Sequence, residues 1–329
     1  MKTIIIAEAG VNHNGNLKKA LKLVSIAKKS GADYVKFQTF IPEEIVTKNA
    51  KIANYQKRGN IKYNQYKLLK KISLSFSDQR KIFKYCKKKK IKFLSTAFDL
   101  KSLDFLLKLG MDYIKIPSGE ITNYPLLRKI SKIKKKIILS TGASTFKDIG
   151  KALNVLKSKK KFLTIMHCNS SYPTPLKDVN LNVLKTMKKK YKYNVGYSDH
   201  TLSLAVPLGS VALGATIIEK HFTDSRKSIG PDHKSSLEPK ELNYMVKLIK
   251  DFESALGSSK KIVTKSEMIN RNIIRKSIVA SKKINKGEKF NINNITSKRP
   301  GNGISPMDQK KVIGKIAIKN FNKDEKIKI

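Results

Sequence analysis

The chain has 329 residues, enough for one large barrel-sized domain and a small second one. It carries 70 Lys and Arg against 24 Asp and Glu, a formal net charge of +46, which could suit nucleic acid or an anionic membrane. Only seven of these basic residues are Arg, and the abundance of Lys, Ile and Asn is typical of an AT-rich genome. No aromatic residues interleave with the lysine runs to stack on bases, so we expect no nucleic-acid partner.

The N-terminal apolar run at residues 4–7 predicts a first strand. Glu8 ends this run far too early for a signal peptide or a membrane span. The two cysteines, Cys86 and Cys168, give neither a disulfide framework nor a thiolate metal spacing. We therefore expect a cytoplasmic protein with no membrane partner.

From this strand onward the pattern alternates between short apolar runs and helical periodicity. Strands are expected at residues 4–7, 34–37, 93–98, 113–116, 137–141, 162–168, 195–197 and 216–222. Helices are expected at residues 17–29, 103–109, 124–134, 146–157, 181–189, 202–213 and 239–256, with a further helix capped by Ser77 and a basic insertion at about 41–75.

Eight strand–helix units predict a (β/α)8 TIM barrel. None of the strands alternates simply between apolar and polar residues, which is typical of strands that are covered on both faces. No Gly-x-Gly-x-x-Gly follows the first strand, which disfavours a dinucleotide fold. After the barrel the chain turns to short strand-like pieces and turns. The expected domains are a barrel at 1–258, a linker at 259–271 and a small, mostly β module at 272–329.

Polar side chains occur at the end of every predicted strand, where a barrel builds its site. They are Glu8, Lys36 with Gln38, Ser95, Lys115 with Ser118 and Glu120, Ser140, His167, Ser198 with His200, and Glu219 with His221. Lysines, hydroxyls and exposed backbone N–H groups suit a phosphate. Two imidazoles at neighbouring strand ends near carboxylates suit a divalent metal that polarises a carbonyl. The pattern predicts a metal-dependent barrel enzyme acting on a phosphorylated anion.

Seven ordered motifs and the tail resemble the sialic acid (N-acetylneuraminate) synthase family, whose small C-terminal domain is antifreeze-like. The motifs begin at Ala7, Val35, Lys115, His167, Gly196, Glu219 and Gly230, and the tail runs from Arg275 through Arg299-Pro-Gly-Asn-Gly. The match extends nearly from end to end. It departs from the family in the basic insertion and at Asn169-Ser170-Ser171, where some members have Asn in place of Ser170.

The resemblance implies that phosphoenolpyruvate condenses with N-acetylmannosamine to give N-acetylneuraminate and phosphate, by C–O cleavage. It implies that His200 and His221 bind a divalent metal, Mn²⁺ or else Mg²⁺ or Co²⁺, with Glu8 nearby. Glu8 and Glu120 would be the catalytic carboxylates. Phosphoenolpyruvate would be held by Lys36, Lys115, Ser118, Ser140, Ser170 and Ser198. The sugar would face Gln38, Glu120, Tyr172, Asp232 and Arg299, with Arg299 reaching the barrel mouth of a partner in a domain-swapped homodimer.

Three alternatives stay open. The acceptor could instead be the 6-deoxy diacetamido hexose of the legionaminate and pseudaminate branches. A Schiff-base aldolase could use Lys36, Lys115 or Lys220, because strand-end lysines in barrels do this work. A basic protein that binds an anionic polymer without catalysis is the alternative outside enzymes.

Overall fold

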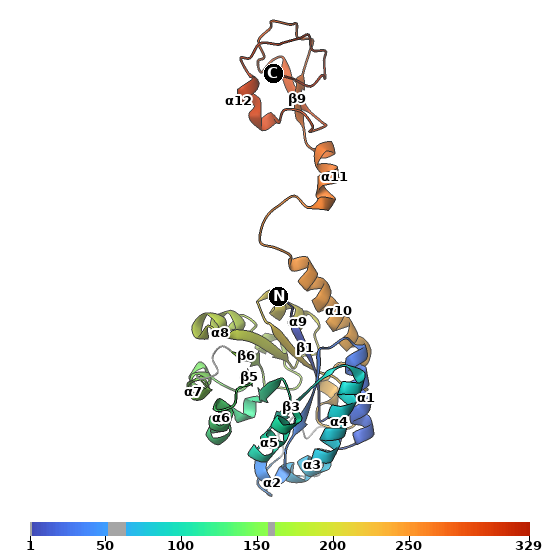
Figure 1. The fold of residues 1–329 in the computed structure, drawn as a ribbon, viewed down its shortest axis with the longest axis vertical. Coiled ribbons are helices and arrows are strands. Elements are labelled where there is room, and N and C mark those ends of the chain that lie inside the picture. The colour runs from blue at the N-terminus through green and yellow to red at the C-terminus, as the bar shows by residue number, and fades with distance from the viewer. Residues whose placement is uncertain (1, 52–63, 157–161) are drawn as a thin grey trace. The chain divides into compact units, whose positions relative to one another are not determined.

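The computed structural model describes residues 2–51, 64–156 and 162–329 (Figure 1). The chain divides into two compact units, Met1–Gly257 and Ser258–Ile329. The basic insertion expected at 41–75 lies partly outside the described residues, as do the last residue of the helix expected at 146–157 and the lysine run at 159–161.

Eight parallel strands close into a barrel in the first unit, so the predicted fold class is confirmed. Each strand pairs with the next, and the last pairs with the first through the register Ile4↔Ile217 to Glu8↔His221. The strands are β1 Ile4–Gly10, β2 Tyr34–Thr39, β3 Lys92–Ala97, β4 Tyr113–Ile116, β5 Lys136–Ser140, β6 Leu163–Cys168, β7 Asn194–Asp199 and β8 Ile217–His221. β1, β2 and β7 extend two or three residues beyond the C-terminal ends of the predicted apolar runs, because barrel hydrogen bonding continues into the polar strand ends. The other strand boundaries differ from the predicted ones by at most one residue.

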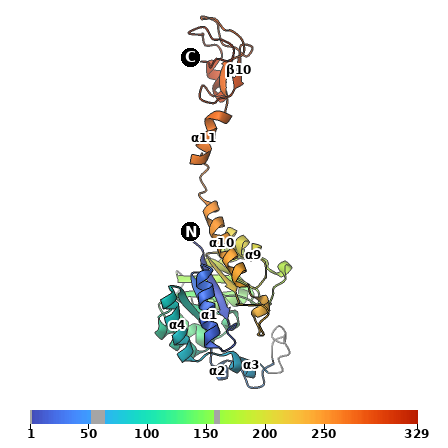
Figure 2. The same cartoon turned by 90° about the vertical axis from the view of Figure 1, so that its right-hand side faces the viewer.

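Helices surround the barrel, and α1 and α4 lie side by side on its outside (Figure 2). They are α1 Leu17–Lys29, α2 Pro42–Ile45, α3 Gln65–Ile72, α4 Phe76–Lys89, α5 Leu100–Leu109, α6 Tyr124–Ser131, α7 Phe146–Leu156, α8 Val183–Tyr191, α9 Ala205–Ala212 and α10 Pro239–Leu256. None of the described helices is both long and apolar enough to cross a membrane.

The start of α4 corrects one prediction. Ser75, not Ser77, caps this helix: its Oγ accepts a hydrogen bond from the N–H of Asp78 at 3.0 Å, and its hydroxyl also donates to the Asp78 carboxylate. The reason is local, because Ser75 has the extended backbone of a cap while Ser77 already lies in the first helical turn. The end predicted at Gly110 for α5 is confirmed, since this residue has φ of +83°.

The second unit contains a two-stranded antiparallel sheet, β9 Ser277–Ala280 and β10 Ile295–Lys298, and a small core around Phe290 and Phe321. Its α11, Lys265–Ile274, begins inside the segment expected to be a linker at 259–271. Thr264 and Glu267 cap this helix reciprocally, through side chain to backbone hydrogen bonds in both directions. The helix exposes Met268, Ile269 and Ile273, so the segment lacks the buried apolar stripe by which the barrel helices were predicted.

Candidate active site

A cavity of about 410 Å³ opens at the C-terminal end of the barrel strands. Twelve of the fourteen predicted site residues line it: Glu8, Lys36, Gln38, Lys115, Ser118, Glu120, Ser140, Ser170, Tyr172, Ser198, His200 and His221. For ten of them the sequence signal was their position at strand ends, and closure of the barrel brings these ends around one mouth. Ser170 and Tyr172 were predicted from the family resemblance alone.

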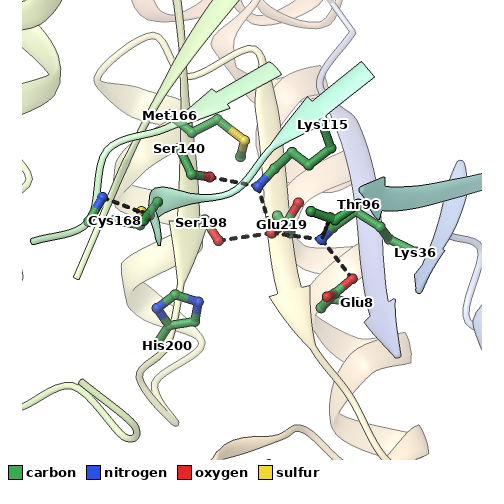
Figure 3. Close-up of polar contacts among 12 residues, drawn as sticks. Glu8, Lys36, Thr96, Lys115, Ser140, Met166, Cys168, Ser198, His200 and Glu219 are labelled. Atoms are coloured by element: carbon green, nitrogen blue, oxygen red, sulfur yellow. Dashed lines mark hydrogen bonds and ion pairs between the residues drawn. The ribbon is translucent and has the colours of Figure 1, made fainter. Parts of the chain in front are cut away.

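The floor of the cavity is a buried charge network (Figure 3). The Lys36 ammonium lies 3.0 Å from Glu8 Oε2 and 3.5 Å from Glu219 Oε1. The Lys115 ammonium approaches Glu219 Oε1 at 3.5 Å and donates to Ser140 Oγ at 2.6 Å. Glu219 thus joins both lysines, although the sequence analysis placed it only in the ring of strand ends and gave it no role.

Burial and these pairings shift the ionisation of all four groups. Burial alone would raise the pKa of Glu219, but Lys115 and Lys36 hold that pKa well below its usual value. Burial would lower the pKa of Lys36, yet the carboxylates of Glu219 and Glu8 raise it. Burial is the dominant influence on Glu8 and Lys115, so the pKa of the Glu8 carboxyl is raised and that of the Lys115 ammonium is lowered. With Glu8 protonated, the floor carries an excess positive charge that an anion can neutralise.

Hydroxyl groups surround the two lysines. Thr96 Oγ1 accepts from the Lys36 ammonium at 3.0 Å, and Ser198 donates to Glu219 Oε1 at 3.1 Å. On the neighbouring loop, the N–H of Gly142 donates to Ser118 Oγ at 2.8 Å. A Cβ on Gly142 would stand 2.4 Å from Ser170 Oγ and 2.9 Å from Ser118 Oγ, so this position must be glycine for the two serines to converge.

Two imidazoles lie beside the charged floor, with their ring centroids 5.3 Å apart. His200 Nδ1 bonds to the carbonyl of Asn169, which can only accept, so the proton is on Nδ1 and Nε2 keeps its lone pair. Burial lowers the pKa of His200 to about 4 and places that of His221 well below its ordinary value. Both rings are therefore neutral near pH 7, the state a metal ligand needs.

The donor set fits a divalent metal in part. His221 Nδ1 is buried without a hydrogen-bond partner in the part of the chain that the structure describes, which leaves a nitrogen free to coordinate. Within the same part, no group of three or more His, Cys, Asp or Glu side chains is arranged to hold an ion. Two protein nitrogens could therefore hold a metal whose other positions go to water or substrate, the open arrangement of catalytic sites.

Two predicted site residues do not line the cavity. Asp232 lies just behind it, with Oδ2 3.8 Å from His221 Nδ1, and burial raises the pKa of its carboxyl to about 6. Arg299 is exposed in the second unit, where its Nε donates to the carbonyl of Ile274 at 3.0 Å.

Two residues of the predicted strand-end ring and one of the proposed Schiff-base lysines also face elsewhere. His167 Nε2 bonds to the carbonyl of Val179 at 2.8 Å, and Ser95 Oγ bonds to Thr39 Oγ1 at 2.7 Å. Lys220, one of the proposed Schiff-base lysines, is completely buried in an ion pair with Asp199 at 2.5 Å. Consecutive strand residues point to opposite faces, so Glu219 and His221 reach the barrel mouth while Lys220 points away from it.

The cavity also has a side that the sequence analysis did not predict. Ile45 and Val46 from the end of α2, Gln65 and Leu69 from α3, and Phe98 after β3 complete its lining. Four of the five belong to the basic insertion, whose lysine content concealed its few apolar positions, and Phe98 packs against the hydrophobic cluster to which the insertion contributes Leu68 and Ile72. The cavity therefore combines a floor with two lysines, which suits a phosphorylated anion, with two neutral imidazoles and an apolar side.

Comparison with known families supports this chemistry. A family model described as the NeuB family matches residues 23–261, and a SAF domain model matches residues 275–328. The two matches fall on the barrel unit and on the small second unit.

The N,N'-diacetyllegionaminic acid synthase of Campylobacter jejuni is 49% identical over 99% of both chains. The Legionella pneumophila enzyme of the same name is 41% identical over 95% of this chain and 90% of its own length. The crystal structure of N-acetylneuraminic acid (sialic acid) synthetase from Leptospira borgpetersenii, a complex with citrate, superposes with a TM-score of 0.72. That structure is 34% identical and covers 82% of this chain and 90% of its own.

Proposed function

The chain belongs to the NeuB family, and from this premise we propose that it condenses phosphoenolpyruvate with a 6-deoxy diacetamido hexose to a legionaminate-type acid, releasing phosphate. The sequence analysis took N-acetylmannosamine as the main acceptor and this sugar as the alternative. The 49% and 41% identical relatives, both named for diacetyllegionaminic acid, support the alternative better. The observation that carries the reaction class is the Lys36–Glu219–Lys115 floor beside two neutral imidazoles.

Phosphoenolpyruvate would bind at the floor through its phosphate and carboxylate. Lys115 and Lys36 supply two cations, and Ser140 and Ser198 already contact this network. Ser118 and Ser170, which converge on Gly142, add hydroxyl donors at the side. Charge-assisted contacts of this kind are roughly twice as strong as neutral hydrogen bonds, so the anion is held firmly while its methylene carbon faces the acceptor.

His200 and His221 would hold the metal, for which we propose Mn²⁺ over Mg²⁺ or Co²⁺ because imidazole nitrogen suits a borderline ion. When bound, the metal polarises the aldehyde of the open-chain sugar. The sugar would bind in the space lined by Tyr172, Gln38 and Glu120. The ring centroid of Tyr172 lies 4.1 Å from that of His200.

The carboxylates would serve the two charge changes of the reaction. The methylene carbon of the enol attacks the aldehyde carbon, the new alkoxide takes a proton, and the former enol carbon becomes an oxocarbenium. Glu8, whose pKa is raised, can hold the proton, and Glu219, whose pKa is lowered, remains an anion that stabilises the cationic carbon. Water adds at that carbon and loses a proton, and the tetrahedral intermediate expels phosphate by cleaving its C–O bond.

The Schiff-base alternative depends on a neutral lysine in the cavity. Lys220 does not face it, and the raised pKa of Lys36 keeps that amine protonated. Of the two lysines that line the cavity, Lys115 is the one whose pKa is lowered, chiefly by burial, so it is the position to test by borohydride trapping with a sugar aldehyde. Arg299 as a sugar ligand and the domain-swapped homodimer stay predictions from the resemblance.

Phosphate release tests the proposed function. With Mn²⁺ present, phosphoenolpyruvate should release phosphate only when an acceptor is added, fastest with the 6-deoxy diacetamido hexose and more slowly with N-acetylmannosamine. Borohydride should trap no sugar adduct. A trapped adduct on Lys115 without phosphate release would instead identify an aldolase, and affinity for an anionic polymer with a steep salt dependence and no turnover would identify a binding protein.

A further inference from the structure

The described parts of segment 41–75, residues 41–51 and 64–75, share a hydrophobic cluster with residues that follow β1 and β2. Val11, Phe40, Leu68 and Ile72 form a hydrophobic cluster separate from the main barrel core, and Ile45, Leu69 and Phe98 pack against it while half-buried. α2 and α3 lie beyond the ends of the strands (Figures 1 and 2). The cluster therefore holds these last three side chains in place, so they are not loosely tethered surface residues.

Polar contacts fix the same segment to the barrel. The N–H of Ile41 donates to the Asp99 carboxylate at 3.0 Å, and Glu44 pairs with Lys101 at 2.5 Å. Within the segment, the Tyr66 hydroxyl donates to Glu43 at 2.7 Å, which joins α3 to α2. Both described parts of the segment are therefore positioned well enough to shape a binding site.

Ile45, Val46, Leu69 and Phe98 form what we term the apolar flank. Among the described residues, these four are the branched aliphatic and phenylalanine side chains that line the cavity. The cations and carboxylates of the cavity lie on the floor within the strands, or on the loop that carries Glu120. The cavity thus has a charged end and an apolar flank, with Gln65 as the amide on the flank side.

The chemistry of the acceptor sugar determines which of its carbon atoms faces the charged floor of the cavity and which faces the apolar flank. Carbon 1 of the open-chain sugar carries the aldehyde and must meet phosphoenolpyruvate at the floor, so carbon 6 lies toward the mouth. Flank residues follow the strand ends in sequence, and Phe98 comes directly after β3. A 6-deoxy sugar presents a methyl group at carbon 6, whereas N-acetylmannosamine presents a hydroxymethyl group.

We propose that the apolar flank selects the acceptor by burying the methyl end of the 6-deoxy sugar, an inference that rests on the proposed function. Burying the methyl group is favourable, whereas a hydroxyl placed against Ile45, Val46, Leu69 and Phe98 loses its water and finds no polar group on these four side chains. Discrimination by one such group is worth about 10- to 200-fold in kcat/KM, because an apolar pocket rejects an added hydroxyl only moderately. Ile45, Val46 and Leu69 thereby give the described parts of the basic insertion a role in acceptor specificity, together with Phe98.

Leu69→Asn tests this role, with Lys67→Asn as the matched control on an exposed position of the same helix. The measured quantity is the ratio of kcat/KM for the 6-deoxy diacetamido hexose to that for the same diacetamido hexose with a hydroxyl at carbon 6, because this pair differs at carbon 6 alone. Leu69→Asn should lower this ratio by about tenfold or more. Lys67→Asn should leave it unchanged, and the KM for phosphoenolpyruvate should stay the same in both variants.

Phe98→Tyr adds only one hydroxyl and provides a second, milder variant if Leu69→Asn fails to fold. A ratio within twofold of the wild-type value in the folded variants, with unchanged KM for phosphoenolpyruvate, would overturn the role of the flank while leaving the proposed function intact. A wild-type preference for N-acetylmannosamine would overturn the acceptor and the flank together. No phosphate release by the wild type with either sugar would overturn the proposed function itself, and the inference with it.

Discussion

His221→Ala should lower turnover by at least about 100-fold and raise the Mn²⁺ concentration needed for half-maximal activity. Changes around a metal commonly cost 10- to 100-fold in affinity or activity even when a residue only supports a ligand, and His221 is proposed as a ligand itself. Its Nδ1 has no hydrogen-bond partner in the described chain, so its removal breaks no hydrogen bond through this atom. Titration of activity with Mn²⁺, beside a far-UV circular dichroism spectrum, measures both effects.

His167→Gln is the control, because His167 also ends a strand but bonds to the carbonyl of Val179 outside the central cavity. It should leave the Mn²⁺ requirement unchanged. EDTA should abolish turnover of the wild-type protein. Full activity in the presence of EDTA would show that the reaction does not need a metal.

Lys115→Met should raise the KM for phosphoenolpyruvate by about 10- to 100-fold. The substitution keeps an unbranched side chain that is shorter by one atom, and it removes a charge-assisted contact worth about 1.5–3 kcal/mol. It also leaves Glu219 with Lys36 as its remaining partner among the floor lysines. Initial-rate kinetics with each substrate varied in turn should show a much smaller change in the KM for the sugar.

Lys92→Met is the matched control, since Lys92 pairs with Asp112 at an exposed position at the start of β3. Exposed pairs of this kind contribute about 0–1 kcal/mol, so both KM values should stay near those of the wild type. A Lys115 effect confined to the sugar would mean that the two subsites are reversed.

The alternation of strands and helices could be predicted because each element carries its own signal. α1 and α10 were predicted to the residue from helical spacing and their terminal residues. Boundaries elsewhere moved by a few residues, as for α9, because hydrogen bonding and capping, not hydrophobicity, decide where an element ends. α11 was missed although Thr264 and Glu267 form a capping box, because the helix buries no apolar face.

Site residues could be predicted where a charged side chain stands at a strand end. Whether a given strand residue points into the barrel mouth or away from it was harder to predict. Strands buried on both faces give no alternation from which to tell that Glu219 points inward and Lys220 outward. The partnership of Glu219 with both lysines is a product of barrel closure, since Lys36 and Lys115 come from distant strands. The apolar flank required tertiary contacts between segment 41–75 and Phe98 that no local pattern contains.

The most direct test of the central claim follows the bridging oxygen of phosphoenolpyruvate, labelled with ¹⁸O, through one turnover with the 6-deoxy diacetamido hexose. Condensation with C–O cleavage requires that the label leave with inorganic phosphate and that the new acid take its oxygen from water. Mass spectrometry of both products gives the answer. Label in the phosphate confirms the account, and label retained in the sugar acid contradicts it.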